Sequence, residues 1–335
     1  MAALKERAEF NRQRILQFLV ELGRISRLFA QEEIRLCVLK GPLLSQHLFG
    51  DASLRTSADL DILVRSEAVE QAEALLLDLG YQHSYPAMPL TPRQWQIYQR
   101  DWRHLNYYLP DRRILVELHW TIASPNLVPI QEVRNMFARS RPTVLAGSTV
   151  YTLSQEDLPV YLLIHGSLHS WARLKWLVDF SVWMRRASDP DWEGLQTKMK
   201  DLSLQRSLAQ GILLAHRLFS MSIPEPLQEL LAAEPQAQDM AEHSLKAILN
   251  VRYTAADKGR FQRLKIILYK TKLKNNLQYK WNTLTEIWVI PDDWLDLPLP
   301  DVLFPLYWLL RPFLWFRRYH LRRRGERLAT PPPES

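Results

Sequence analysis

The sequence has very little cysteine and no long apolar run. Its single cysteine, Cys37, excludes a disulfide within the chain, which is typical of proteins from reducing compartments. No apolar stretch approaches the roughly 20 residues that a membrane-spanning helix needs. The N-terminus, MAALKERAEFNRQR, is charged from the start and lacks the apolar core of a signal peptide. We therefore expect a cytoplasmic protein.

Net positive charge is small outside the C-terminal segment. The net charge is +7, but residues 311–328 hold seven arginines against one acid, Glu326, so the rest of the chain is close to neutral. A nucleic-acid-binding face spread over the whole protein would need a wider basic surface. The charge distribution argues against such a face and raises a separate question about the C-terminus.

Apolar periodicity and runs of strand-forming residues divide the chain into elements. Helices are expected over 4–33 (as one helix or two joined at Gly23), 42–49, 66–79, 157–188, 192–220, 225–250 and 260–288. Strands are expected over 37–39, 59–64, 104–109 and 114–120, the last two as a hairpin. The segment through Pro86, Pro89 and Pro92 is expected to be a loop with little regular structure.

This order of elements predicts an α+β fold class, in which a mixed α/β unit is followed by a mainly helical domain. We expect 1–150 to hold the N-terminal helix and the α/β unit, and 151–295 to form the helical domain. Residues 296–335 would be an apolar and basic segment whose last residues, 329–335, are disordered.

Two carboxylates, Asp59 and Asp61, stand two residues apart on an expected strand, so both point to the same face. Adjacent carboxylates repel each other and are costly at the start of an apolar run. A divalent cation would resolve that conflict, and Mg²⁺ is typically held by carboxylates together with substrate phosphates. Glu117 lies in another strand-like run and would complete a three-carboxylate cluster if the two strands are neighbours.

Lys40 and Gly41 lie where an expected strand turns into an expected helix beginning at Pro42. Free backbone N–H groups and the helix dipole favour phosphate at such a turn. Gly41 permits close backbone approach, and Lys40 supplies a cation for a triphosphate. The sequence contains no Walker motif. The turn and the carboxylate pair together predict a site for a nucleotide and its metal.

The residues around these motifs resemble the nucleotidyltransferases of the DNA polymerase beta superfamily. The closest branch is the group described as uncharacterised nucleotidyltransferases, which is kin to toxin enzymes of the abortive-infection type. The resembling stretches are Val38–Leu44 with Leu54–Val64, Val116–Trp120, His165–Asp179 and Pro305–Pro312. These stretches are distributed over most of the chain. Each motif alone is weak, but together they are specific for this family.

The resemblance implies that residues 1–150 contain a polymerase-beta-like catalytic unit. It makes Asp59, Asp61 and Glu117 the metal ligands, with Mg²⁺ as the expected ion and Mn²⁺ as a substitute. Many superfamily members have Gly-Ser where this chain has Lys40-Gly41, which suggests that Lys40 replaces the usual hydroxyl contact to phosphate. It also implies that Arg55 and Ser57 line the same loop. The expected substrate is an NTP, with ATP favoured only because it is the commonest.

The motif at 165–179 has three interpretations. His165 and His169 are four residues apart on a helix and could chelate zinc, although the metalloprotease pattern is missing because Gly166 follows His165. They could instead be a buried structural pair. The interpretation we favour is that this helix faces the active site. The residues expected to touch triphosphate or acceptor are His169, Arg173 and Lys175, and Asp179 is expected to pair with Arg173 or Lys175.

The apolar, arginine-rich stretch at 302–327 is interrupted by Pro305, Arg311 and Pro312 and cannot span a bilayer. It could dock on the protein with its arginines solvated, lie peripherally on the inner face of an anionic membrane, or contact RNA. Docking is the interpretation we favour.

The function that these observations predict is transfer of a nucleoside monophosphate from an NTP to an acceptor, with release of pyrophosphate. Two alternatives stay open. One is a nucleotide-binding or scaffolding module of a biosynthetic assembly with little catalysis, and the other is a toxin-like enzyme that modifies tRNA. The sequence does not name the acceptor, the base or the oligomeric state, since a fold does not fix its substrate.

Overall fold

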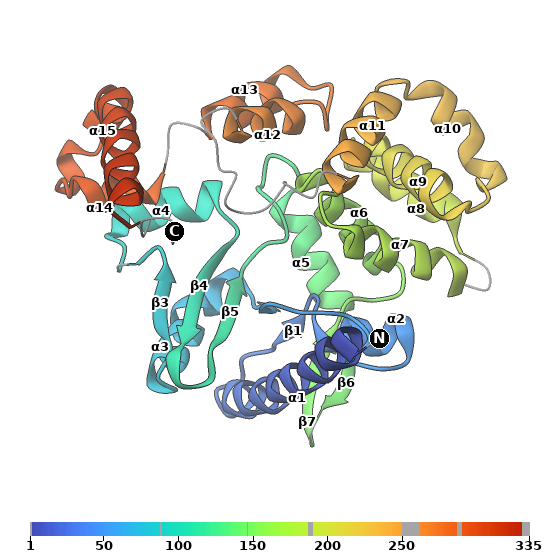
Figure 1. Cartoon of the computed structure of the whole chain (residues 1–335), viewed down its shortest axis with the longest axis horizontal. Coiled ribbons are helices and arrows are strands. Elements are labelled where there is room, and N and C mark those ends of the chain that lie inside the picture. The colour runs from blue at the N-terminus through green and yellow to red at the C-terminus, as the bar shows by residue number, and fades with distance from the viewer. Residues whose placement is uncertain are drawn as a thin grey trace, which may run out of the picture.

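A mixed sheet of seven strands runs through the centre of the molecule (Figure 1). The computed structural model describes residues 2–87, 89–145, 147–186, 190–249, 262–286 and 290–329, and only the backbone of 2, 3, 262, 263 and 318–329. The strands are β1 Cys37–Val38, β2 Leu60–Leu63, β3 Gln82–Tyr85, β4 His104–Leu109, β5 Ile114–His119, β6 Arg141–Leu145 and β7 Ser148–Thr152.

The sheet order is β3-β4-β5-β2-β1-β7-β6. The pairs β2–β5 and β1–β7 are parallel, and the other neighbours are antiparallel. The short strands β1 and β2 therefore lie in the middle, where both of their faces are buried. Their central position agrees with the apolar character of residues 37–39 and 62–64.

Side-chain alternation along the central strands separates two apolar cores, one on each face of the sheet. Cys37 and Leu63 belong to a core shared with α6, α7 and α9, whereas Val38 and Ile62 belong to a core shared with α1 and α3. Each strand thus packs helices on both sides. The ends of β1 and β2, which precede and contain the candidate site residues, are therefore held between helices on both faces of the sheet.

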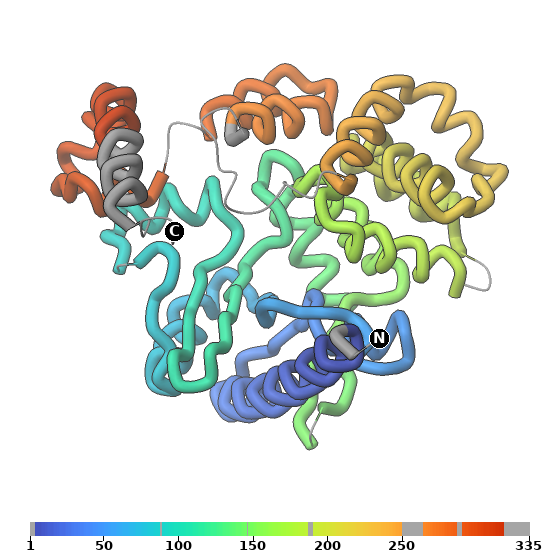
Figure 2. Tube along the Cα trace, viewed as in Figure 1, coloured from blue at the N-terminus to red at the C-terminus, as the bar shows by residue number. Residues whose placement is uncertain are grey.

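The helices surround the sheet unevenly. They are α1 Ala2–Gln31, α2 Pro42–Phe49, α3 Val69–Asp78, α4 Pro92–Asp101, α5 Ile130–Arg139, α6 Asp157–Leu168, α7 Leu174–Arg186, α8 Trp192–Asp201, α9 Gln205–Phe219, α10 Gln228–Ala233, α11 Gln236–Leu249, α12 Gln262–Lys270, α13 Leu277–Thr285, α14 Pro291–Asp296 and α15 Leu306–Ala329. The chain trace places α8–α11 at one end of the molecule and α14–α15 at the other, with α12 and α13 between them (Figure 2).

The fold class is confirmed as α+β, with a helical region after the sheet. The first helix is continuous through Gly23, and the helix expected over 157–188 is two helices separated by a turn that contains Ser170 and Trp171, both at positive φ. The proposed domain boundaries stay predictions.

The stretches expected to be helical over 192–220, 225–250 and 260–288 are each divided into two α-helices. Two further segments differ from the sequence-based expectation. The proline-rich loop lies between β3 and α4, and Pro92 is the first residue of α4. Thr91 caps that helix through a capping box with Gln94. The three prolines in this segment led to the prediction of a loop, although this capping sequence is typical of a helix N-terminus. The β6–β7 hairpin was missed because β6 is largely exposed and contains Pro142, so it lacks the alternation of a half-buried strand.

The C-terminal segment docks on the protein through part of its apolar surface. Phe304, Tyr307 and Leu314 are buried in the core that contains α1. Arg311 is not solvated, because its guanidinium lies 2.7 Å from a carboxylate oxygen of Asp293. Contact of 302–327 with a membrane or RNA stays a prediction. None of the described helices is long and apolar enough to cross a bilayer. Disorder was expected over 329–335; Ala329 is the last residue of α15, and residues 330–335 lie outside those described.

Candidate active site

Parallel pairing of β2 and β5 brings the predicted carboxylates together. Asp61 lies opposite Glu117 in the register of the two strands, so the expected adjacency of these strands is confirmed. Asp59 directly precedes β2, and its backbone carbonyl accepts a hydrogen bond from Ser57 Oγ at 3.3 Å.

Lys40 extends from the end of β1 to the neighbouring strand. Backbone pairing continues past β1, where the Leu39 N–H donates to the Asp61 carbonyl at 3.0 Å. The Lys40 ammonium lies 2.7 Å from Asp61 Oδ1 in an ion pair, and both side chains are largely buried. The cation expected at the phosphate turn therefore also neutralises the central carboxylate.

The two aspartates differ in their electrostatic surroundings. Burial raises the pKa of Asp59 to about 6, and the negative charge of Asp61 adds to that rise. Burial alone would raise the pKa of Asp61 too, but Lys40 and then His119 outweigh it and hold that pKa well below its ordinary value. Asp61 is thus the stronger acid of the pair.

Two histidines that the sequence analysis did not select complete the cluster. His119 Nε2 lies 3.4 Å from Asp61 Oδ1 and 3.2 Å from Glu117 Oε2. The rings of His104 and His119 are 4.6 Å apart. The expected hairpin contained the signal, because Glu117 and His119 alternate onto one face of the same strand and His104 lies opposite His119.

The turn after β1 has the geometry that its glycine predicts. Gly41 has φ 76°, in the left-handed region that side chains disfavour. A Cβ there would lie 3.5 Å from Ser57 Oγ, which is ordinary contact, so the positive φ is what requires glycine. Gly41 precedes the first residue of α2, and no side chain caps that helix end. The turn therefore presents backbone N–H groups beside Lys40.

The loop between α2 and β2 is fastened to α7. Arg55 Nε lies 3.0 and 2.9 Å from the two carboxylate oxygens of Asp179, and both side chains are buried. The expectation that Asp179 pairs with Arg173 or Lys175 is therefore wrong: the buried loop arginine is its hydrogen-bonded partner. Lys175 Nζ donates to the Thr56 carbonyl at 3.2 Å, and burial lowers the pKa of Lys175 to about 8.

Helix α6 ends beside the carboxylate cluster. His169 Nε2 lies 3.0 Å from the guanidinium of Arg103, a residue that sequence analysis missed. Burial lowers the pKa of both His165 and His169, and the positive charge of Lys40 contributes in each case. Arg173 is exposed and lies over the ring of Trp176 at 5.7 Å. Contact of His169, Arg173 or Lys175 with triphosphate or acceptor stays a prediction.

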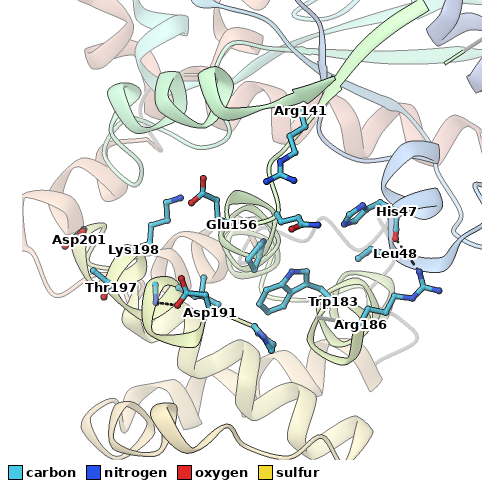
Figure 3. Close-up of a pocket in the computed structure, with 15 residues that line it drawn as sticks. His47, Leu48, Arg141, Glu156, Trp183, Arg186, Asp191, Thr197, Lys198 and Asp201 are labelled. Carbon is cyan, nitrogen blue, oxygen red and sulfur yellow. Dashed lines mark hydrogen bonds between the residues drawn. The ribbon is translucent and has the colours of Figure 1, made fainter. Parts of the chain in front are cut away.

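A large cavity lies elsewhere in the molecule. It has a volume of about 1000 Å³ and is lined by His47 at the end of α2 and by Trp183 and Arg186 at the end of α7 (Figure 3). Lys40 and Lys175 lie at the opposite ends of these two helices. The cavity is therefore separate from the carboxylate cluster and contains none of the residues predicted to act in catalysis.

The donors present at the cluster fit a divalent cation. Both carboxylate oxygens of Asp61 are buried; Oδ1 is ion-paired with Lys40, whereas Oδ2 has no hydrogen-bond partner among the described residues. Such an orphaned oxygen is unusual in a folded protein unless an ion or water serves it. Asp59, Asp61 and Glu117 offer the oxygen ligands that Mg²⁺ takes. His104, Glu117 and His119 also bring three potential ligand atoms within 4.8 Å of one another.

The neighbouring carboxylates and the adjacent turn at Lys40-Gly41 are the arrangement expected of a nucleotidyltransferase. The family model described as "uncharacterised nucleotidyltransferase" matches residues 1–220, and the chain belongs to that family. A search of curated proteins finds no significant match. Among solved structures, a solution structure of the antibiotic-resistance factor ANT(2'')-Ia is similar with a TM-score of 0.31 and 13% identity, over 67% of this chain and 95% of that one.

Proposed function

We propose that this enzyme transfers a nucleoside monophosphate from an NTP to an acceptor in an Mg²⁺-dependent reaction that releases pyrophosphate. The observation that carries the proposal is the register of β2 and β5, which sets Asp61 beside Glu117, together with the ion pair between Asp61 and Lys40. Acceptor oxygen would bond to the α-phosphorus as the bond from that phosphorus to pyrophosphate breaks, and the acceptor proton would be released.

Each group in the site has a role in this reaction. Asp59, Asp61 and Glu117 would hold Mg²⁺, which supplies activation of the attacking oxygen and neutralisation of the leaving phosphate. Lys40 would bind the triphosphate as a point charge, since it already lies at the turn before α2. Lys175 would add a second cation from α7, because its ammonium group is close enough to Asp59 for the two charges to interact. Mn²⁺ would substitute for Mg²⁺, as both prefer oxygen ligands.

The test follows labelled NMP from each of the four NTPs into cell extract and total tRNA. The wild-type protein with Mg²⁺ should transfer label and release pyrophosphate. Asp59→Asn should abolish turnover while keeping the circular dichroism spectrum of the wild type, whereas the exposed control Asp78→Asn should be fully active. Undiminished metal-dependent turnover of Asp59→Asn would sink the proposed function.

The same screen separates the two alternative functions. Label recovered on tRNA alone would support the toxin-like activity. Nucleotide binding without pyrophosphate release from any NTP would support the scaffolding module. ATP is the first donor to test. We also propose that the protein is cytoplasmic. Residues 302–327 are the segment to test for contact with a membrane or RNA.

A further inference from the structure

The open end of the β4–β5 hairpin gathers two imidazoles and a carboxylate. His104, the first residue of β4, lies opposite His119, the last residue of β5. Glu117 stands two residues before His119, so the two side chains share a face of the sheet. The hairpin register alone therefore brings three side chains of metal-ligating type to one place.

Their separations match those of ligands around one ion. His119 Nε2 lies 3.2 Å and His104 Nδ1 lies 3.9 Å from Glu117 Oε2. Nitrogen and oxygen ligands about 2.0–2.2 Å from a tetrahedral ion lie roughly 3.4 Å from each other. Small side-chain rotations would bring all three donors to an ion, without any change in the strands.

The hydrogen bonding of the two imidazoles is incomplete. The side chain of His119 is 5% exposed and that of His104 is 14% exposed. The Nδ1 atoms of both rings are buried without a hydrogen-bond partner among the described residues. Buried polar atoms are normally paired. His104 Nδ1, the ring nitrogen that lies 3.9 Å from Glu117 Oε2, is therefore an unpaired donor atom at the place where an ion would bind. The ring nitrogen of His119 that faces Glu117 is Nε2, at 3.2 Å.

We propose that His104, Glu117 and His119 bind a divalent metal ion of the class that prefers imidazole, such as Zn²⁺ or Co²⁺. Imidazole ligands suit these ions, whereas carboxylates and phosphates suit Mg²⁺. The hairpin site is thus chemically distinct from the proposed Mg²⁺ site at Asp59 and Asp61, although it shares Glu117 with it. Its occupancy does not depend on NMP transfer.

A hydrogen-bonded arrangement of the same residues, without a metal ion, predicts that the protein does not bind Co²⁺ or Zn²⁺ here. A protonated His119 could simply bridge Glu117 and Asp61, whose oxygens lie 3.2 and 3.4 Å from its Nε2. In that case the ring would repel a metal ion and His104 would contribute only packing. Metal binding by the isolated protein distinguishes the two arrangements.

The experiment titrates Co²⁺ into full-length protein that has been stripped with a chelator, in the absence of nucleotide, and records the visible absorption of the bound ion. Wild type should bind one equivalent with a spectrum of nitrogen and oxygen ligation. His104→Ala should weaken this binding by at least about tenfold, whereas the exposed control His216→Ala should not change it. Wild type without saturable Co²⁺ absorption, or equal binding by His104→Ala, would overturn the proposal.

Two further measurements keep the result interpretable. X-ray absorption of the Zn²⁺-loaded wild type should show two imidazole ligands, and a spectrum without imidazole would refute the site even if the variants misfold. Asp59→Asn should bind Co²⁺ as wild type does, because Asp59 is outside the hairpin site. Loss of turnover in that variant tests the proposed function, and loss of Co²⁺ binding in His104→Ala tests the metal site, so either can fail alone.

Discussion

Lys40 Nζ lies 2.7 Å from Asp61 Oδ1, which joins the turn that follows β1 to the centre of β2. The ammonium group and any metal ion at Asp61 compete for the same carboxylate. At the same time Lys40 is the cation that we place against the triphosphate. The ion pair therefore links metal binding to nucleotide binding through one side chain.

Replacement of Lys40 by methionine should destabilise the protein and make it more responsive to metal. Removing one partner of a buried ion pair costs about 3 kcal/mol of unfolding free energy, and His119 at 3.4 Å offsets part of that cost. Because the competing ammonium is gone, Mn²⁺ should raise the melting temperature of Lys40→Met more than that of wild type. The exposed control Lys200→Met should melt as wild type does. An equal Mn²⁺ response in Lys40→Met and wild type would contradict the competition.

The glycine of the phosphate turn has a matched control elsewhere in the chain. Gly41 and Gly147 have φ of 76° and 78°, and a Cβ would find room at both positions. Alanine at either site should therefore cost a similar backbone strain, about 1 kcal/mol. Gly41→Ala alone should weaken binding of the NTP, measured by calorimetry with Mg²⁺. Equal nucleotide affinity of the two variants would remove the turn from the binding site.

The central part of the site could be predicted because its signals are local. A strand followed by Lys40-Gly41, and two aspartates on one face of the next strand, need only strand geometry to be interpreted. The position of Glu117 needed one further step, the pairing of β5 with β2. The proximity of His104 and His119 could also have been predicted, because the expected hairpin register places them opposite each other.

Other contacts could not be predicted, because they join segments far apart in the chain. Arg55 and Asp179 are separated by 124 residues, and Arg103 and His169 by 66. No periodicity or spacing indicates which of several nearby cations a buried acid will meet, because tertiary packing decides it. The sequence accordingly suggested the neighbouring Arg173 and Lys175 as partners of Asp179, and the structure corrects that choice.

Nucleotide affinity should fall as the pH rises through about 8. Burial lowers the pKa of Lys175 to about 8, so this lysine is charged at pH 7 and largely neutral at pH 9. Loss of a charge-assisted contact of about 1.5–3 kcal/mol should weaken NTP binding by roughly tenfold or more over that interval. Lys175→Met should bind weakly at pH 7 and show little further change at pH 9. A pH profile of affinity identical to that of wild type would exclude Lys175 from the site.

The lowered pKa of Lys175 also affects the stability of the protein, which should rise with pH where nucleotide affinity falls. The folded protein holds the Lys175 proton less tightly than the unfolded chain, whose lysine pKa is near 10.5. Between pH 8 and 10.5 the unfolded state therefore binds more protons, and the contribution of Lys175 favours the folded state as the pH rises. Urea unfolding of wild type and Lys175→Met at pH 7 and pH 9.5 should show the destabilising effect of this lysine shrinking at the higher pH.

The buried pair of Arg55 and Asp179 should behave as a unit. Arg55→Met leaves the Asp179 carboxylate buried without its guanidinium, and Asp179→Leu leaves the guanidinium without its acid, so each single change should cost about 3–5 kcal/mol of unfolding free energy. The double variant removes both charges and should recover most of that loss, because a buried pair is often replaceable by apolar side chains. Urea unfolding of the four proteins gives the coupling energy directly. Additive losses in the double variant would show that the two residues stabilise the loop before β2 independently of each other.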